Sequence, residues 1–196
     1  MTLRVRLISP AWSEAGREAR FDDEGPLDPR GLADARAAAD ELGAAPGAVY
    51  ASPSRRCRET AEALGPAEVV VADVWAGCAM GRWRGRTLTE LAGAEPEAVA
   101  RWLADPAAAP HGGESVRELR ARIGGVLDAA AGREAGGAGG RLVAVVEPDV
   151  VRAAVLHALA LPDETFWRLD VRPLTVTELV GRAGRWNLLL GRAAGA

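Results

Sequence analysis

The chain has 196 residues, of which 48% are hydrophobic and 26% charged. This composition supplies enough apolar material for one sizeable core, and the length is short for two, so we expect a single domain over residues 1–196. A net charge of −3 and a pI near 5.5 argue against binding to nucleic acid or to anionic membranes, because neither polyanion would be attracted over a long range.

Targeting and metal-binding patterns are also missing from the sequence. The N-terminus has no apolar targeting segment, and no stretch reaches the length of a membrane span, so we expect a cytoplasmic protein. The cysteines, Cys57 and Cys78, lack metal-type spacing and are expected to be reduced thiols. The two histidines, His111 and His157, do not form a metal-ligand pattern with them. We therefore expect neither a metal nor a cofactor.

Strands and helices alternate in the first part of the chain. Asp28-Pro29 reads as an N-cap followed by proline at the first helical position. The predicted order is a strand at 3–8, a helix at 29–42, a strand at 48–51, a helix at 55–64 and a strand at 68–72. This βαβα order favours a parallel sheet.

The middle of the chain is predicted to be a loop followed by helices. Residues 73–86 hold two tryptophans, three arginines and three glycines without a clear period, which is typical of a long functional loop. Helices are expected from about Thr87, at 94–103 and at 114–131. The glycine-rich run 132–140 is expected to be a flexible surface turn.

The last third begins with the strongest strand pattern. Residues 142–146 are apolar throughout, as in a central parallel strand covered on both faces. A helix at 150–160 follows. Strands at 167–171, 175–180 and 186–190, the last two joined by residues 181–184, are expected to be antiparallel. The predicted fold class is α/β, with three α/β/α layers, a mainly parallel central sheet and an antiparallel edge. A pocket is expected at the carboxyl ends of the strands.

Four segments resemble the histidine phosphatase superfamily, also called phosphoglycerate-mutase-like, and especially its small bacterial branch related to alpha-ribazole phosphatases. They occur in the order found in that family and span nearly the whole chain. They are Gly25-Pro26-Leu27-Asp28-Pro29-Arg30-Gly31, Ser52-Pro53-Ser54-Arg55-Arg56-Cys57-Arg58-Glu59-Thr60-Ala61, Gly81-Arg82-Trp83-Arg84-Gly85 and Pro110-His111-Gly112-Gly113-Glu114-Ser115. The resemblance implies a phosphoglycerate-mutase-like fold.

The same resemblance implies that most phosphate-handling residues are replaced. Ser9-Pro10-Ala11 stands where the family has Arg-His-Gly, and Glu147-Pro148-Asp149 stands where its second histidine belongs. The proton-donating carboxylate falls at Gly77 or Ala79. Proline has no nucleophilic nitrogen, so phosphohistidine chemistry is excluded at position 10. Of the phosphate-binding set only Arg56 remains.

Arg56 and Glu147 are the candidate catalytic residues. Charges about 4 Å apart at an effective dielectric near 20 interact by roughly 4 kcal/mol. A glutamate beside Arg56 therefore turns the preference of the pocket from phosphate to a neutral or cationic ligand. The pair either orients such a ligand, with Glu147 as a possible general base, or simply neutralises an inherited arginine.

The candidate ligand-binding residues, besides Arg56 and Glu147, share predicted positions near the former phosphate pocket. Trp12 and Trp75 offer aromatic faces that can stack on a flat or cationic group, although ordinary loop packing explains them as well. Asp149 is either an acid or a helix cap. The full set is Ser9, Trp12, Ser13, Arg56, Trp75, His111, Glu147 and Asp149. Trp83, Trp102, Trp167, Trp186 and His157 are expected to be structural.

These observations predict a degenerate histidine-phosphatase-like protein without phosphohistidine chemistry. Its cleft would bind a non-phosphate small molecule, neutral or cationic, or a protein partner. The alternative is an enzyme with recruited acid/base chemistry, such as isomerisation, dehydration or cyclisation in a specialised metabolic pathway, with Glu147 and Arg56 at its centre. Fold alone does not choose between the two, and the sequence does not indicate an oligomeric state.

Overall fold

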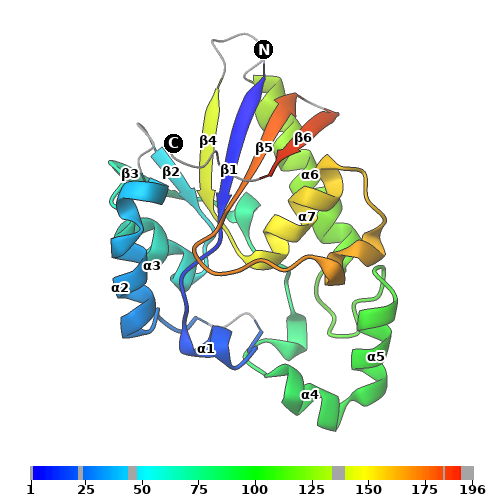
Figure 1. Cartoon of the computed structure of the whole chain (residues 1–196). Coiled ribbons are helices and arrows are strands. Elements are labelled where there is room, and N and C mark those ends of the chain that lie inside the picture. The colour runs from blue at the N-terminus through cyan, green and yellow to red at the C-terminus, as the bar shows by residue number, and fades with distance from the viewer. Residues whose placement is uncertain (1, 22–23, 44–47, 134–139, 183, 191–196) are drawn as a thin grey trace.

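The computed structural model describes residues 2–21, 24–43, 48–133, 140–182 and 184–190 (Figure 1). Six strands form one sheet in the order β3-β2-β4-β1-β5-β6. Their bounds are β1 Leu3–Ile8, β2 Ala48–Ala51, β3 Glu68–Val71, β4 Arg141–Val145, β5 Val176–Arg182 and β6 Arg185–Leu189. The four strands from β3 to β1 pair in parallel, whereas β5 and β6 are antiparallel. The predicted fold class, with its antiparallel edge, is confirmed.

Helices cover both faces of this sheet. Within the described residues their bounds are α1 Glu14–Arg17, α2 Pro29–Ala37, α3 Arg55–Ala63, α4 Leu88–Ala94, α5 Pro96–Ala104, α6 Val116–Arg133 and α7 Pro148–Ala158. α6 and α7 pack on one face, and α3, with α2 beside it, packs on the other (Figure 1). None of the described helices is both long and apolar enough to cross a bilayer.

β4 shows why the apolar strand run predicted a covered strand. Side chains of successive strand residues point to opposite faces. Val143 and Val145 lie in the core that contains Cys57 of α3, and Ala144 lies in the core beneath α6 and α7. Both faces are dry, so the strand needs apolar residues throughout, as predicted.

Local capping sets several helix starts. The Asp28 side chain accepts the N–H of Gly31 at 2.6 Å, with Pro29 at the first helical position, and Thr87 and Glu90 form a capping box at the start of α4. Both satisfy main-chain donors that the first helical turn leaves unpaired. α7 begins at Pro148 rather than at Val150. Asp149 therefore lies inside the first turn, and the prediction that it caps the helix is wrong.

Two further predicted boundaries differ from the structure. The helix that starts at Pro29 ends at Ala37, and a π-helical turn over Ala39–Gly43 follows, which carries Leu42 into the core with Val49. α6 extends to Arg133, so Gly132 is helical. The rest of the predicted surface turn, from 134 to 139, lies outside the described residues.

The predicted strand at 167–171 is wrong. Phe166 and Trp167 belong to a 3-10 helix, Asp163–Arg168, and the following residues do not pair with the sheet. The Leu169 carbonyl accepts a hydrogen bond from Arg152 instead of from a neighbouring strand. The alternating apolar side chains pack against helices: Trp167 lies edge to face on Trp102 of α5, with ring centroids 4.3 Å apart.

Two helices extend the molecule beyond the carboxyl ends of the parallel strands. In Figure 1, α4 and α5 lie below the end of β1, together with the short α1. The two 3-10 turns at Asp73–Trp75 and Gly81–Trp83 connect this region to the sheet. Their arrangement surrounds the carboxyl edge of the sheet, which is where α/β folds place their ligand sites.

Candidate functional site

A pocket of about 690 Å³ lies at the carboxyl ends of the parallel strands. Its lining comes from loops after β1 and β2, from the loop that follows β3, and from the first turns of α7. α5 and the segment 166–173 complete the wall. The size is typical of a small-molecule site. The predicted position of the pocket is confirmed.

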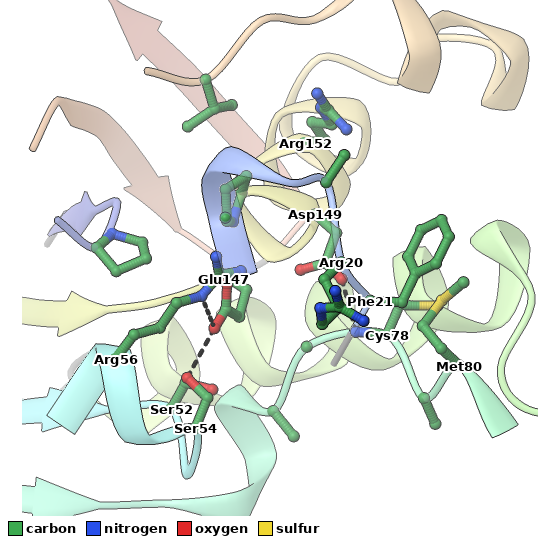
Figure 2. Close-up of a pocket in the computed structure, with 18 of the residues that line it drawn as sticks. Arg20, Phe21, Ser52, Ser54, Arg56, Cys78, Met80, Glu147, Asp149 and Arg152 are labelled. Atoms are coloured by element: carbon green, nitrogen blue, oxygen red, sulfur yellow. Dashed lines mark hydrogen bonds and ion pairs between the residues drawn. The ribbon is translucent and has the colours of Figure 1, made fainter. Parts of the chain in front are cut away.

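Arg56 and Glu147 form a bidentate ion pair in this pocket (Figure 2). Nε of Arg56 donates to Oε1 of Glu147 at 2.8 Å, and a terminal amino group of Arg56 donates to Oε2. Ser54 adds a third bond, from its hydroxyl to Oε1 at 2.7 Å. The Glu147 side chain is 9% exposed and that of Arg56 is 25% exposed. The ion pair anticipated from the sequence is therefore present, and it is largely shielded from water.

The pair leaves little free charge at this end of the pocket. Burial disfavours the charged form of Arg56, but the attraction of Glu147 and the hydrogen bonds to it outweigh burial and raise the pKa of Arg56 above its ordinary value. The guanidinium therefore stays charged at every physiological pH. Its charge is balanced within the protein, so it is not available to a dianionic ligand without breaking the pair.

Asp149 lies next to this pair, at the start of α7. Its Oδ2 accepts the N–H of Cys78 at 2.7 Å, and its Oδ1 accepts the N–H of Val150 at 2.7 Å. Burial, and then the negative charge of Glu147, raise the pKa of Asp149 despite these two donors. A carboxyl group held in a pocket with a raised pKa is a common feature of functional sites.

The raised pKa of Asp149 makes a pH-dependent prediction for Asp149→Asn. The folded protein holds the Asp149 proton more tightly than the unfolded chain, so this contribution to stability is present below the ordinary carboxyl pKa, near 3.9, and is lost as the pH rises through the folded value. Asparagine does not titrate. The free energy of unfolding of the variant relative to wild type should therefore increase from about pH 3 to about pH 7, as measured by urea denaturation. A pH-independent or falling difference would contradict it.

Gly77 is one of the two positions, with Ala79, to which the resemblance assigns the proton-donating carboxylate. A Cβ at this position would lie 3.1 Å from Cγ of Glu147 and 3.4 Å from each carboxylate oxygen of Asp149. These contacts are at or inside the close limit for carbon neighbours. Glu147 and Asp149 thus occupy the space into which a side chain at position 77 would extend.

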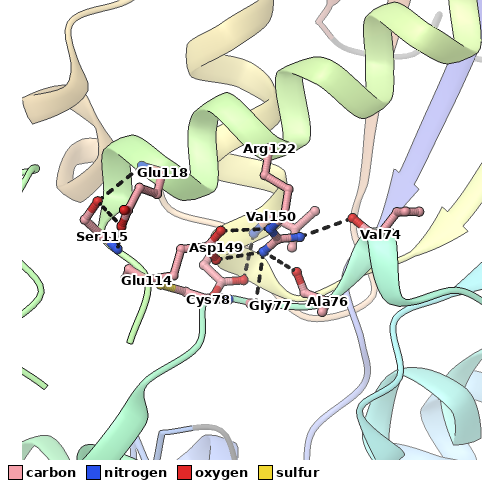
Figure 3. Close-up of polar contacts among 10 residues, drawn as sticks. All are labelled: Val74, Ala76, Gly77, Cys78, Glu114, Ser115, Glu118, Arg122, Asp149 and Val150. Atoms are coloured by element: carbon pink, nitrogen blue, oxygen red, sulfur yellow. Dashed lines mark hydrogen bonds and ion pairs between the residues drawn. The ribbon is translucent and has the colours of Figure 1, made fainter. Parts of the chain in front are cut away.

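Arg122 of α6 fixes the segment that contains Gly77 (Figure 3). Its guanidinium donates to the main-chain carbonyls of Val74 at 3.2 Å, Ala76 at 3.0 Å and Gly77 at 3.3 Å. Two further bonds, both 2.8 Å, join it to the carboxylate of Glu114. Arg122 therefore holds the carbonyl groups of this part of the loop against α6, and the loop backbone forms a defined wall of the pocket.

Trp12 lines the pocket, in agreement with its predicted position. Its side chain is 38% exposed, and Cζ of Arg17 lies 5.0 Å from the ring centroid. The structure thus brings Trp12, Arg56, Glu147 and Asp149 to one pocket. The other four candidate residues lie outside its lining.

The two serines are used by the scaffold. Ser9 is buried; its hydroxyl accepts the N–H of Thr175 at 3.1 Å and donates to the carbonyl of Arg172. Ser13 is the N-cap of α1 and accepts the N–H of Gly16 at 3.1 Å. Both hydroxyls thus stabilise neighbouring backbone and do not line the pocket.

Trp75 and His111 pack in the interior. Trp75 is 2% exposed and belongs to the core beneath α6 and α7, so packing explains it. The ring of His111 lies 5.1 Å from that of Trp83, and its Nδ1 accepts the N–H of Gly113 at 3.0 Å. Burial, and then the charge of Arg82, lower the pKa of His111. His157 pairs with Asp128 at 3.1 Å, in agreement with its predicted structural role.

An aromatic wall is the main feature that sequence reasoning missed. Phe21, Trp102, Phe166 and Trp167 all line the pocket. Their ring centroids are 5.5 Å apart for Phe21 and Trp102, 4.3 Å for Trp102 and Trp167, and 4.9 Å for Trp167 and Phe166. These residues come from three distant segments, and their individual patterns predict only core packing.

Arg152 is a further pocket residue that the sequence analysis did not identify. It lines the pocket from α7, three residues after Asp149, and its Nε donates to the carbonyl of Leu169 at 2.7 Å. Its position was available from the sequence, because residues three apart on a helix share a face. Cys57 is buried and Cys78 is half-buried, and these two described thiols do not form a disulfide with each other. Within the described ranges, no group of three metal-ligating side chains is found.

Relatives of known sequence support the superfamily resemblance. The family model of the histidine phosphatase superfamily (branch 1) matches residues 9–193. A bifunctional protein of Mycobacterium tuberculosis (strain H37Rv) and a protein of Mycobacterium bovis without an assigned function are each 33% identical to the chain over 127 residues, which is 61% of this chain. The match covers 35% of either relative, so the chain spans about a third of their length.

Solved structures resemble the whole fold. A structure described as mycobacterial hydrolase 1 is 26% identical, with a TM-score of 0.82, and the match covers 97% of this chain and 98% of that one. A mycobacterial glucosyl-3-phosphoglycerate phosphatase is also 26% identical, with a TM-score of 0.80 over 96% of this chain and 97% of the other. The same phosphatase has been solved in complex with VO3. A putative alpha-ribazole-5'-P phosphatase from Escherichia coli, 21% identical, shares the fold with a TM-score of 0.80 over 99% of this chain and 98% of that one. The chain therefore belongs to the histidine phosphatase superfamily, branch 1.

Proposed function

We propose that this member of the superfamily does not carry phosphoryl groups on histidine and that its pocket binds a small molecule without a phosphate group. The observation that carries the proposal is the bidentate bond between Arg56 and Glu147. Arg56 is the remaining arginine of the family's phosphate-binding set, and it is already bound to a carboxylate of the protein. Phosphate would have to displace that carboxylate and would then face its charge.

The positions around the pair support the same proposal. Pro10 lines the pocket in place of a phosphorylated histidine, and its ring nitrogen has no lone pair available for attack. Gly77 supplies no proton donor, and the space beside it is filled by Glu147 and Asp149. Nucleophile, phosphate clamp and leaving-group acid are therefore replaced together. A relative that is a phosphatase, such as the mycobacterial glucosyl-3-phosphoglycerate phosphatase, is expected to differ from this chain in function.

An acid/base enzyme is the second candidate function. In such an enzyme, Asp149 would be a better acid/base residue than Glu147. Three nitrogen or hydroxyl donors already occupy the oxygens of Glu147, which leaves it poorly placed to take a proton from a substrate. The raised pKa of Asp149 in the same pocket suits a proton donor. If such a reaction exists, Asp149→Asn should abolish its turnover without unfolding the protein.

Hydrolysis assays test the proposed function. We expect the purified protein to release no phosphate from 4-nitrophenyl phosphate, 3-phosphoglycerate, phosphoserine or glucosyl-3-phosphoglycerate. A variant with Arg56→Met, purified in parallel, controls for contaminating phosphatases. Turnover by the wild-type protein that disappears in this variant would contradict the proposal, because it would show that Arg56 holds a phosphate during catalysis.

A further inference from the structure

Besides Arg56 and Glu147, four charged side chains line the pocket. Arg20 and Glu24 are bound to Glu18 and Arg84, whereas Asp149 and Arg152 have no ion-pair partner among the described residues. Asp149 and Arg152 both line the pocket from the first turns of α7, and Figure 2 shows both side chains at the α7 side of the pocket. Residues three apart lie on one face of a helix, with Cβ atoms roughly 5–6 Å apart. Although the charge of Asp149 attracts Arg152, no ion pair joins these two described residues. A ligand group can therefore lie between them.

Arg152 has unused hydrogen-bonding capacity. Its Nε is bonded to the Leu169 carbonyl, and Cζ lies 5.5 Å from the ring centroid of Phe166. Its two terminal amino groups form neither a hydrogen bond nor an ion pair with any residue in the described ranges. Burial lowers the pKa of Arg152, and the opposing attraction of Asp149 and Asp170 does not fully offset it, which means that the surroundings on balance disfavour its charge. A guanidinium in this state gains from an acceptor with negative charge.

Asp149 has the complementary requirement. Each of its oxygens accepts one main-chain N–H, and a carboxylate can accept about four hydrogen bonds. The spare lone pairs, together with a pKa raised by burial and by Glu147, favour a ligand group that donates hydrogen bonds or carries positive charge. Asp149 and Arg152 thus require a donor and an acceptor about one helical turn apart.

The aromatic wall continues directly from this charged end. Phe166 lies under Arg152, and Trp167, Trp102 and Phe21 follow it in contact along the pocket. Such a wall suits a flat or apolar group, which would stack on or meet the ring edges. The size of the cavity, about 690 Å³, admits a molecule that occupies the wall and the charged end at the same time.

We infer that the pocket binds a small molecule with an aromatic body and a dipolar head, whose N–H donor faces Asp149 and whose carbonyl or carboxylate oxygen faces Arg152. An aromatic α-amino acid and an aromatic amide share this chemistry. A simple amine would be repelled by the positive charge of Arg152. A simple carboxylate would be repelled by the negative charge of Asp149. A purely apolar ligand would bury both charges without partners, which is costly. The inference rests on the proposed function and names its ligand class.

Isothermal titration calorimetry with four indole compounds tests the inference. The dipolar compounds are L-tryptophan and indole-3-propionamide, and the singly charged ones are tryptamine and indole-3-propionate. We expect at least one dipolar compound to bind roughly tenfold or more tightly than both singly charged ones. The tighter of the two dipolar compounds then identifies the head as an amino acid or as an amide.

Variants assign the two ends of the head. Arg152→Met should remove the advantage of the dipolar compound over tryptamine, and Asp149→Asn should remove its advantage over indole-3-propionate. Arg152→Lys, which keeps the charge but lacks the planar fork, should retain part of the advantage and serves if Arg152→Met unfolds. Arg168→Met is the matched control, because Arg168 is exposed and does not line the pocket; binding to it should equal wild type.

Two results would overturn the inference but leave the proposed function standing. One is binding of tryptamine or indole-3-propionate that is as tight as that of both dipolar compounds. The other is the absence of binding by both dipolar compounds at about 10 mM, which corresponds to less than about 3 kcal/mol of affinity. Phenyl phosphate gives the distinguishing outcome: if it binds more tightly than all four indole compounds, both the inference and the proposed function are wrong.

Discussion

Replacing Glu147 with alanine is expected to destabilise the protein by about 3 kcal/mol, because the substitution leaves Arg56 without its charge partner in a largely buried place. Removing one member of a buried pair commonly costs about 3–5 kcal/mol. We expect the lower end of that range, since Arg56 keeps 25% of its side chain exposed and can be partly hydrated. Urea denaturation measures the loss as a lower midpoint with an unchanged slope.

A matched control for Glu147→Ala comes from an exposed ion pair. Asp34 lies 3.9 Å from Arg30, and the two side chains are 51% and 83% exposed. Such a pair contributes little, so Asp34→Ala should change stability by at most about 0.5 kcal/mol. If Glu147→Ala costs no more than Asp34→Ala, the pair of Arg56 and Glu147 is not the buried, strongly bound pair that the proposed function requires.

Restoring a carboxylate at position 77 is expected to produce the second large effect. Gly77→Glu should cost about 3 kcal/mol, because overpacking a filled site typically costs about 1–3 kcal/mol and the new carboxylate would face those of Glu147 and Asp149. Gly77→Ala, whose Cβ would lie 3.1 Å from Cγ of Glu147, should cost less, about 1 kcal/mol. Thermal and urea denaturation of both variants give the comparison.

Gly125→Glu controls for the substitution itself. Gly125 lies in α6, and a Cβ there would meet no atom within 4 Å, so the variant should fold with wild-type stability or better.

The loss of stability caused by Gly77→Glu should also become smaller toward acidic pH, where carboxyl groups are neutral. A Gly77→Glu protein as stable as wild type at neutral pH would show that the space beside Glu147 is open, contrary to our description of the pocket.

The sheet and most helices follow from local patterns, whereas the segment 167–171 does not. The apolar run of β4 has only one stable environment, a strand covered on both faces, and Asp28-Pro29 satisfies the first donors of α2 by itself. Residues 167–171 alternate in the same way as a strand, but their apolar side chains pack against α5 and α7. A period of two records which side chains are buried; it does not record what buries them.

The candidate site was predictable to a similar degree. Arg56 follows β2 and Glu147 follows β4, and these two strands are parallel neighbours in the sheet, so the topology alone brings the residues together. Ser9 also follows a strand, yet its hydroxyl points to residues 172–175, whose path depends on the whole fold. The aromatic wall assembles from α5, the 3-10 helix at Asp163–Arg168 and the segment that contains Phe21, and no local pattern indicates that these segments meet.

The residues that we propose have replaced the phosphate-handling groups fit one another. Glu147 supplies the negative charge that Arg56 would otherwise take from a ligand, and Gly77 leaves the space that Glu147 and Asp149 occupy. A pocket of about 690 Å³ remains. The charged side chains in it that have unused hydrogen-bonding capacity are Asp149 and Arg152, on the first turns of α7. Under the proposed function, the scaffold of the superfamily is therefore retained around a site with a different balance of charge.

Titration with orthovanadate, an analogue of phosphate, measures the central claim most directly. We predict that wild-type protein binds it no more tightly than in the millimolar range, a free energy of about 4 kcal/mol or less. Glu147→Gln, which keeps an acceptor for Arg56 but removes the opposing charge, should bind it more tightly than wild type. Micromolar binding by the wild-type protein, unchanged or weakened by Glu147→Gln, would contradict the account.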